Sequence, residues 1–132
     1  MTARTREVVD RLYDAYLAGD AEGMLALMSP DVAIRFLGQV DLRGIDAARH
    51  FFTASAGLLR DLDFRIQNKV VDGEWAAVTW EETAVVASSG EPWTNHGVDV
   101  LRVEDGLITV VHENNDVRLV HEHFPRYVDG AT

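Results

Sequence analysis

Two carboxylates and a histidine stand at the ends of two neighbouring predicted strands. Asp99 lies in the otherwise apolar segment GVDVLRV, and His112 and Glu113 follow the apolar run that begins at Leu107. A carboxyl group that is desolvated in a pocket has a raised pKa and can act as an acid or a hydrogen-bond donor. These residue types therefore indicate acid–base chemistry on a small molecule.

The register of this hairpin decides which side chain faces Asp99. A two-residue turn at Asp105-Gly106 places His112 opposite Asp99, whereas a three-residue turn with a bulge places Glu113 on that face. The first register predicts an Asp–His dyad, in which the carboxylate orients a general base. The second predicts a carboxylate pair whose mutual repulsion separates the two pKa values.

Other side chains are suited to line the same pocket. Asn95 is in phase with the first carboxylate and Asn115 with the second, and an amide donor can hold a developing oxyanion. Trp80 and Glu82 share one face of the preceding strand, and they supply a stacking wall and a further acid if that face lines the pocket. The other aromatic residues expected in the core or the pocket lining are Tyr16, Phe36, Phe51 and Phe52.

Helical patterns come first along the chain and strand patterns follow. Apolar residues recur at spacings of three and four in residues 4–18, 21–28 and 45–59, which predicts three helices. Strands are predicted at 32–37, 62–71, 75–87 and in the pair between 93 and 115, with a loop from Gly38 to Gly44. This order is typical of an α+β fold rather than an alternating α/β fold.

Long, twisted strands with helices on one face are expected to curl into a half-open cone. We therefore expect three N-terminal helices on the concave face of a curved antiparallel sheet, with one pocket at the mouth of the cone. The length of 132 residues predicts a single domain, 1–132, with a core at about 5–118 and a tail at 119–132.

Composition excludes several classes of function. The net charge of −10 disfavours nucleic acid and anionic membranes as partners, and the absence of Cys excludes disulfides and thiolate chemistry. No apolar run approaches about 18 residues, and the N-terminus lacks the apolar stretch of a signal peptide, so we expect a cytoplasmic protein. The stretch His121-Glu122-His123 has no obvious third ligand, so we expect no metal and no cofactor.

Three segments of the chain resemble the nuclear transport factor 2-like superfamily and, within it, the SnoaL-like group. They are LYDAYLAGDAEGMLALMSPDVAIRF, LRGIDAARHFF and VDVLRVEDGLITVVHENND, and the resemblance spans roughly residues 5 to 118. It implies a cystatin-like curved sheet that forms a cone. Isomerases, cyclases, dehydratases, epoxide hydrolases and non-catalytic domains share this scaffold, so the resemblance alone does not imply one activity.

The resemblance to ketosteroid isomerases assigns an enolate-holding acid to Asp99. The position of the isomerase base falls near Phe36, which cannot accept a proton, so steroid isomerisation by that mechanism is not expected. The position of the oxyanion tyrosine falls near Leu12, with Tyr13 and Tyr16 close by in the sequence.

The resemblance to polyketide cyclases assigns an acid/base carboxylate to Glu113. Its partner in that group is a histidine, and the matching position here is Asp99. In epoxide hydrolases of the limonene type an Arg and an Asp would fall on Glu82 and Ala84, so epoxide opening is not expected.

Our main hypothesis is a cofactor-independent acid–base enzyme, of cyclase, isomerase or dehydratase type, acting on a small apolar carbonyl compound. The alternative is a non-catalytic domain for small-molecule binding or dimerisation. A third hypothesis, a purely structural homodimer, predicts a pocket plugged by side chains such as Phe36 and Trp80. A homodimer is expected in any case, because an outer sheet face that carries Val98 and Val100 requires cover.

Overall fold

A computed structural model describes residues 2–36 and 40–124. Its elements, in chain order, are α1 (Thr2–Leu17), α2 (Ala21–Leu25), β1 (Met28–Phe36), β2 (Val40–Arg43), α3 (Ile45–Ser55), β3 (Leu59–Asp72), β4 (Trp75–Val86), β5 (Pro92–Glu104), β6 (Leu107–Asn115) and α4 (Val117–His123). None of the described helices has the length and apolarity needed to span a membrane.

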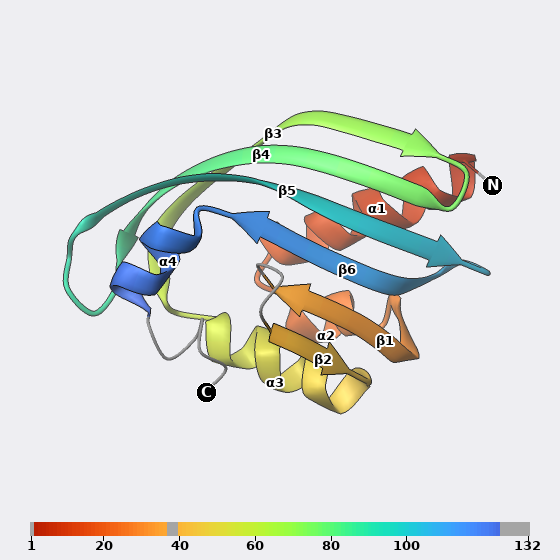
Figure 1. The fold of residues 1–132 in the computed structure, drawn as a ribbon, viewed down its shortest axis with the longest axis horizontal. Helices are drawn as coiled ribbons and strands as arrows, with labels where there is room; N and C mark the ends of the chain where they lie inside the picture. The colour runs from red at the N-terminus through yellow and green to blue at the C-terminus, as the bar shows by residue number, and fades with distance from the viewer. Residues whose placement is uncertain (1, 37–39, 125–132) are drawn as a thin grey trace.

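The strands form one curved sheet with helices packed against it. Its six strands lie in the order β2-β1-β6-β5-β4-β3, and every neighbouring pair is antiparallel except β1 with β6. The long strands β3, β4 and β5 arch over α1, while α3 runs below β1 and β2 and α2 lies behind β1 in this view (Figure 1). The predicted α+β fold with a curved, unclosed sheet is confirmed.

The predicted loop from Gly38 to Gly44 is wrong in part. The segment Val40–Arg43 is strand β2, which pairs antiparallel with β1 from Ala33 to Phe36. A strand of four residues is too short for its alternation to be recognised in the sequence, and it is the pairing with β1 that defines it. Residues 37–39 lie outside the described part of the chain.

Two predicted helices end earlier than expected. The second helix ends at Leu25 rather than at residue 28, because Met28 already begins β1. The third helix ends at Ser55, just before Gly57, whose φ of 84° is left-handed and leaves the helix. The tail predicted at 119–132 begins inside α4, and residues 125–132 lie outside the described part.

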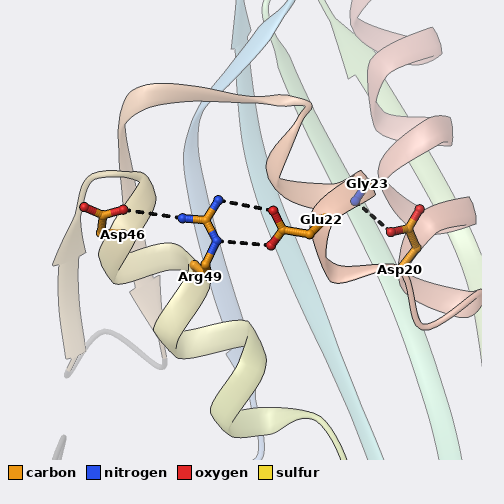
Figure 2. Close-up of polar contacts among 5 residues, drawn as sticks. All are labelled: Asp20, Glu22, Gly23, Asp46 and Arg49. Atoms are coloured by element: carbon orange, nitrogen blue, oxygen red, sulfur yellow. Dashed lines mark hydrogen bonds and ion pairs between the residues drawn. The ribbon is translucent and has the colours of Figure 1, made fainter.

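Polar contacts join α2 to α3, as Figure 2 shows. Arg49 of α3 donates from Nε to Glu22 of α2 at 3.1 Å and from Nη1 to Asp46 at 3.4 Å. Asp20 caps α2 by accepting from the backbone N–H of Gly23 at 2.8 Å. A Cβ at Gly23 would lie 2.2 Å from Asp20 Oδ2, so this glycine makes room for the cap.

The concave face is a close-packed core over the half of the sheet nearest the β5–β6 turn. The face of α1 that carries Val8 and Val9 lies against the sheet there, and both side chains are buried. The strands supply the buried aliphatic side chains of Val103 and Ile108, which pair with each other next to that turn. Burial of each such side chain contributes about 1.5–3 kcal/mol, so this half of the sheet holds the fold together.

Candidate functional site

A cavity of about 370 Å³ opens between the other half of the concave face and the helices. Helices α1, α2 and α3 line one side of it, strands β3 to β6 line the other, and Val120 and Phe124 contribute from α4 and its end. The predicted site residues that line the cavity are Tyr16, Phe36, Phe52, Trp80, Glu82, Asn95, Asp99, Glu113 and Asn115. Phe36 and Trp80 form part of its wall and leave it open, contrary to the hypothesis of a plugged pocket.

The hairpin of β5 and β6 combines features of both predicted registers. Its turn has two residues, Asp105 at φ 51° and Gly106 at φ 80°, as a type I′ turn requires. The register then shifts at Thr109, which is the additional residue of a bulge. Beyond the bulge Glu113 lies directly opposite Asp99.

His112 lies on the other face of the sheet. It pairs with Val100, whose side chain points away from the cavity, and it does not line the cavity. The bulge that brings Glu113 inward turns His112 outward, since neighbouring side chains of a strand alternate between faces. The hypothesis of an Asp–His dyad therefore has no geometric support.

Asp99 is buried, with 9% of its surface exposed, and one of its two oxygens is bound. The hydroxyl of Tyr13 donates to Asp99 Oδ2 at 2.6 Å. Asp99 Oδ1 and Trp80 Nε1 have no hydrogen-bond partner among the described residues. Burial raises the pKa of Asp99 to about 6, although Tyr13 and the nearby Trp80 N–H favour the charged form and oppose the shift.

Glu113 is half-buried and faces Asp99 across the two strands. Burial, followed by the negative charges of Asp99 and Glu82, raises the pKa of Glu113 to about 8. Two carboxyl groups this close do not both ionise readily, so their protons leave in separate steps that belong to the pair. At neutral pH the pair therefore holds about one proton, which gives it both an acid and a base.

Glu82 forms a third acidic position in the cavity. The indole N–H of Trp93 donates to Glu82 Oε1 at 3.1 Å, and the Glu82 side chain is buried. Burial raises the pKa of Glu82 against the opposing effect of Trp93, and the charge of Asp99 raises it further. The three carboxyls are not grouped as ligands of a metal ion; the described residues contain no such group.

The two predicted amides differ in what they contact. Asn95 is buried, and its Oδ1 accepts from the backbone N–H groups of His96 at 2.9 Å and Asp116 at 3.4 Å. It therefore fastens β5 to the start of α4. Asn115 lines the cavity with an Oδ1 that has no partner among the described residues.

An aromatic wall stands beside the carboxyls. The rings of Phe64 and Trp80 lie 5.3 Å apart at 30°, and the ring of Tyr13 stacks on Phe64 at 6.0 Å. Trp80 lies across Gly97, where a Cβ would come within 2.6 Å of Trp80 Cζ2. Sequence reasoning did not assign site roles to Tyr13, Phe64 or Trp93. The nearest signal was the tyrosine position that the family resemblance placed next to Tyr13.

Residues 9–111 of the sequence match the family model described as the SnoaL-like domain. A search of curated proteins gave no match. Solved structures with the same fold include a protein from Jannaschia sp. CCS1 assigned to the SnoaL-like polyketide cyclases. It has 18% identity and a TM-score of 0.83, and the match covers 97% of this chain and 93% of that one.

Two other similar structures hold small molecules. Rv0760c from Mycobacterium tuberculosis is in complex with estradiol-17β-hemisuccinate, with 21% identity, a TM-score of 0.72 and coverage of 88% of this chain and 96% of that one. A protein from Catenulispora acidiphila DSM 44928 with a ketosteroid isomerase-like fold is in complex with trimethylamine, with 12% identity, a TM-score of 0.76 and coverage of 89% and 91%. At these identities the likeness shows the shared fold. Since the family model matches well over half of the sequence, this chain belongs to the SnoaL-like family.

Proposed function

We propose that this protein is a cofactor-independent acid–base enzyme, of cyclase, isomerase or dehydratase type, that acts on a small, apolar carbonyl compound. The observation that carries the proposal is the pairing of Asp99 with Glu113 on the wall of an aromatic cavity. Each of the three reaction types moves a proton next to a stabilised enolate, and this pair supplies a proton acceptor and a proton donor at neutral pH.

In this mechanism Asp99 is the base. Its pKa is the lower of the two, and its Oδ1, which has no hydrogen-bond partner among the described residues, can accept a proton from the carbon next to the substrate carbonyl. Tyr13 holds the other oxygen and fixes the orientation of the carboxylate. Glu113 is still protonated at neutral pH and donates to the carbonyl oxygen on which the enolate charge develops.

The size and character of the cavity support a small and largely apolar substrate. A volume of about 370 Å³ with several aromatic walls is at the lower end of the range for ligand pockets. The complexes of related proteins with estradiol-17β-hemisuccinate and trimethylamine support a role for the cone in holding small molecules. We also propose a homodimer through the outer sheet face, where Val98 is 37% exposed.

The test follows hydrogen–deuterium exchange at the carbon next to the carbonyl, in D₂O, for a panel of aromatic and polycyclic ketones. This readout detects enolisation without knowledge of the product. We expect exchange with the wild type, and a loss of about 100-fold or more in Asp99→Asn and in Glu113→Gln. The control is Glu81→Gln, which changes an exposed residue on the outer face of β4 and should keep the wild-type rate.

Two results would overturn the proposal. Compounds that bind to the wild type and to both variants, with no exchange in any of them, would identify a non-catalytic binding domain. Loss of exchange in His112→Gln but not in Glu113→Gln would show that the acid–base residue is His112 on the outer face and not Glu113 in the cavity.

A further inference from the structure

The cavity carries acidic groups that no basic side chain in the described part of the chain offsets. Its ionisable lining consists of three carboxyls and two phenols, and no Lys, Arg or His of the described residues is among the lining residues. Two basic groups on adjoining elements are paired with other carboxylates: Lys69 with Asp10, and His123 with Glu91 at 3.3 Å. The charge of Asp99 raises the pKa values of Glu82 and Glu113, and the charge of Glu82 raises the pKa of Glu113 further, as expected for carboxyls that share one cavity.

Acceptors also outnumber donors among the buried polar atoms that have no partner. Asp99 Oδ1 and Asn115 Oδ1 are acceptors, and Trp80 Nε1 is the single donor in this group among the described residues. Asp99 and Trp80 are both more than nine-tenths buried, and both line the cavity. A buried acceptor without a partner is unfavourable, so a ligand that brings N–H groups gains more here than one that brings further oxygens.

Glu82 has no part in the proposed proton transfer, yet it is buried in the cavity wall among aromatic rings. Phe64 lies directly opposite it on β3, and Tyr16 packs edge-on against Phe64 with ring centroids 5.3 Å apart. Burial and the charge of Glu82 both raise the pKa of Tyr16, which places the Tyr16 hydroxyl in the field of that carboxylate. A carboxylate beside aromatic rings is a suitable environment for an ammonium group.

We infer that the ligand carries a protonated amine that binds against Glu82 beside the Tyr16 and Phe64 rings, and that carboxylate-bearing compounds are excluded. This inference rests on the proposed function in one respect: the other end of the ligand is taken to carry the carbonyl that reaches Asp99 and Glu113. Glu82 pairs with Asn95, four residues from Asp99 along β5, so the two ends lie on the order of 13 Å apart along the strand. The substrate class is thus an apolar amino-ketone.

The test is a binding titration with three probes that share one ring system: 2-naphthylmethylamine, 2-naphthylmethanol and 2-naphthoate. For the wild type at pH 7 we expect the amine to bind about tenfold more tightly than the alcohol, and no measurable binding of the naphthoate. Glu82→Gln should bind amine and alcohol equally and leave the affinity for the alcohol within about twofold. Glu81→Gln removes the same charge from the outer side of the same strand and should keep the tenfold preference.

A second measurement keeps the inference testable if Glu82→Gln does not fold. Because the amine charge favours ionised carboxyls, its binding to the wild type should release protons, so the calorimetric enthalpy should differ between phosphate and Tris buffers. The alcohol should show no such difference.

Equal binding of amine and alcohol by the wild type, tight binding of the naphthoate, or a preference that survives in a folded Glu82→Gln would overturn the inference. These experiments measure binding without turnover. An absence of ketone exchange would therefore contradict the proposed enzyme activity without affecting the proposed amine site. An absence of the amine preference would contradict the amine site without affecting the proposed enzyme activity.

Discussion

The two halves of the concave face are built from the same strands and have opposite characters. On β6, Ile108 lies in the packed half and is fully buried against aliphatic neighbours, whereas Glu113 lies in the cavity half and faces another carboxyl. They are five residues apart, and a regular strand would turn them to opposite faces. The bulge at Thr109 lets one strand serve both the core and the cavity.

The difference shows where this fold gains and where it loses free energy. The packed half buries aliphatic side chains without polar groups, so each contributes to stability. The cavity half desolvates carboxyls whose pKa values rise, which means that their charged forms are less stable in the folded protein than in water. We therefore expect truncation of a core side chain and neutralisation of a cavity carboxyl to change stability in opposite directions.

The largest effect is expected at Ile108. Replacing it with Ala removes a fully buried side chain and leaves a cavity in the core, so Ile108→Ala should lower the free energy of unfolding by about 2–5 kcal/mol. Urea denaturation monitored by circular dichroism measures this change in the free energy of unfolding. The matched control is Val98→Ala on the outer face, for which we expect a loss below about 1 kcal/mol. Equal losses of stability in Ile108→Ala and Val98→Ala would contradict the proposed difference between the core and the outer face.

The next effect concerns pH. Folding raises the pKa of Glu113 from 4.5 to about 8, so the folded state binds more protons than the unfolded state between these values. The stabilisation from this group is complete below about pH 4.5 and is lost as the pH rises through 8. Glu113→Gln keeps the neutral form at all pH values, so it should be more stable than the wild type at pH 9 by on the order of 2–4 kcal/mol.

Thermal melts of the wild type and Glu113→Gln between pH 4 and pH 9 test this prediction. The two melting temperatures should converge at the acidic end and separate progressively at the basic end. Glu81→Gln, at an exposed position, should follow the wild type throughout. A Glu113→Gln variant that is less stable than the wild type at pH 9 would show that the ionised carboxylate stabilises the cavity.

Much of the fold could be predicted from local patterns. Helical spacing in the first 60 residues and alternation in the long strands identify most elements, because each pattern is local and repeated. Strand β2 was missed because its four residues gain their structure only from pairing with β1. The element ends at Leu25 and Ser55 were missed for a related reason, since a neighbouring strand or turn stops the helix.

The candidate site was harder to predict, because it depends on contacts between distant segments. The side chain of Tyr13 reaches Asp99 across 86 positions of sequence, and helical periodicity alone assigns it to the core. The choice between His112 and Glu113 depends on the bulge at Thr109. Next to it, the backbone N–H of Ile108 donates to Leu27 O at 2.8 Å, a contact from outside the hairpin. Because this contact involves a residue outside the hairpin, the hairpin sequence alone does not distinguish the two registers.

The smallest effect is expected at Gly97, which lies in the cavity half on β5. A Cβ there would come within 2.3 Å of the backbone oxygen of Asn114 and 2.6 Å of Trp80 Cζ2, so both the backbone of β6 and the indole must move in Gly97→Ala. Overpacking of this kind costs about 1–3 kcal/mol. The loss should appear together with a shift in tryptophan fluorescence and weaker binding of 2-naphthylmethanol, because Trp80 forms part of the cavity wall. Val98→Ala, one residue away on the outer face, should change neither signal. Unchanged fluorescence and affinity in Gly97→Ala would show that the position of the Trp80 indole does not depend on this glycine. The cavity half would then accept an added methyl group as readily as the outer face does.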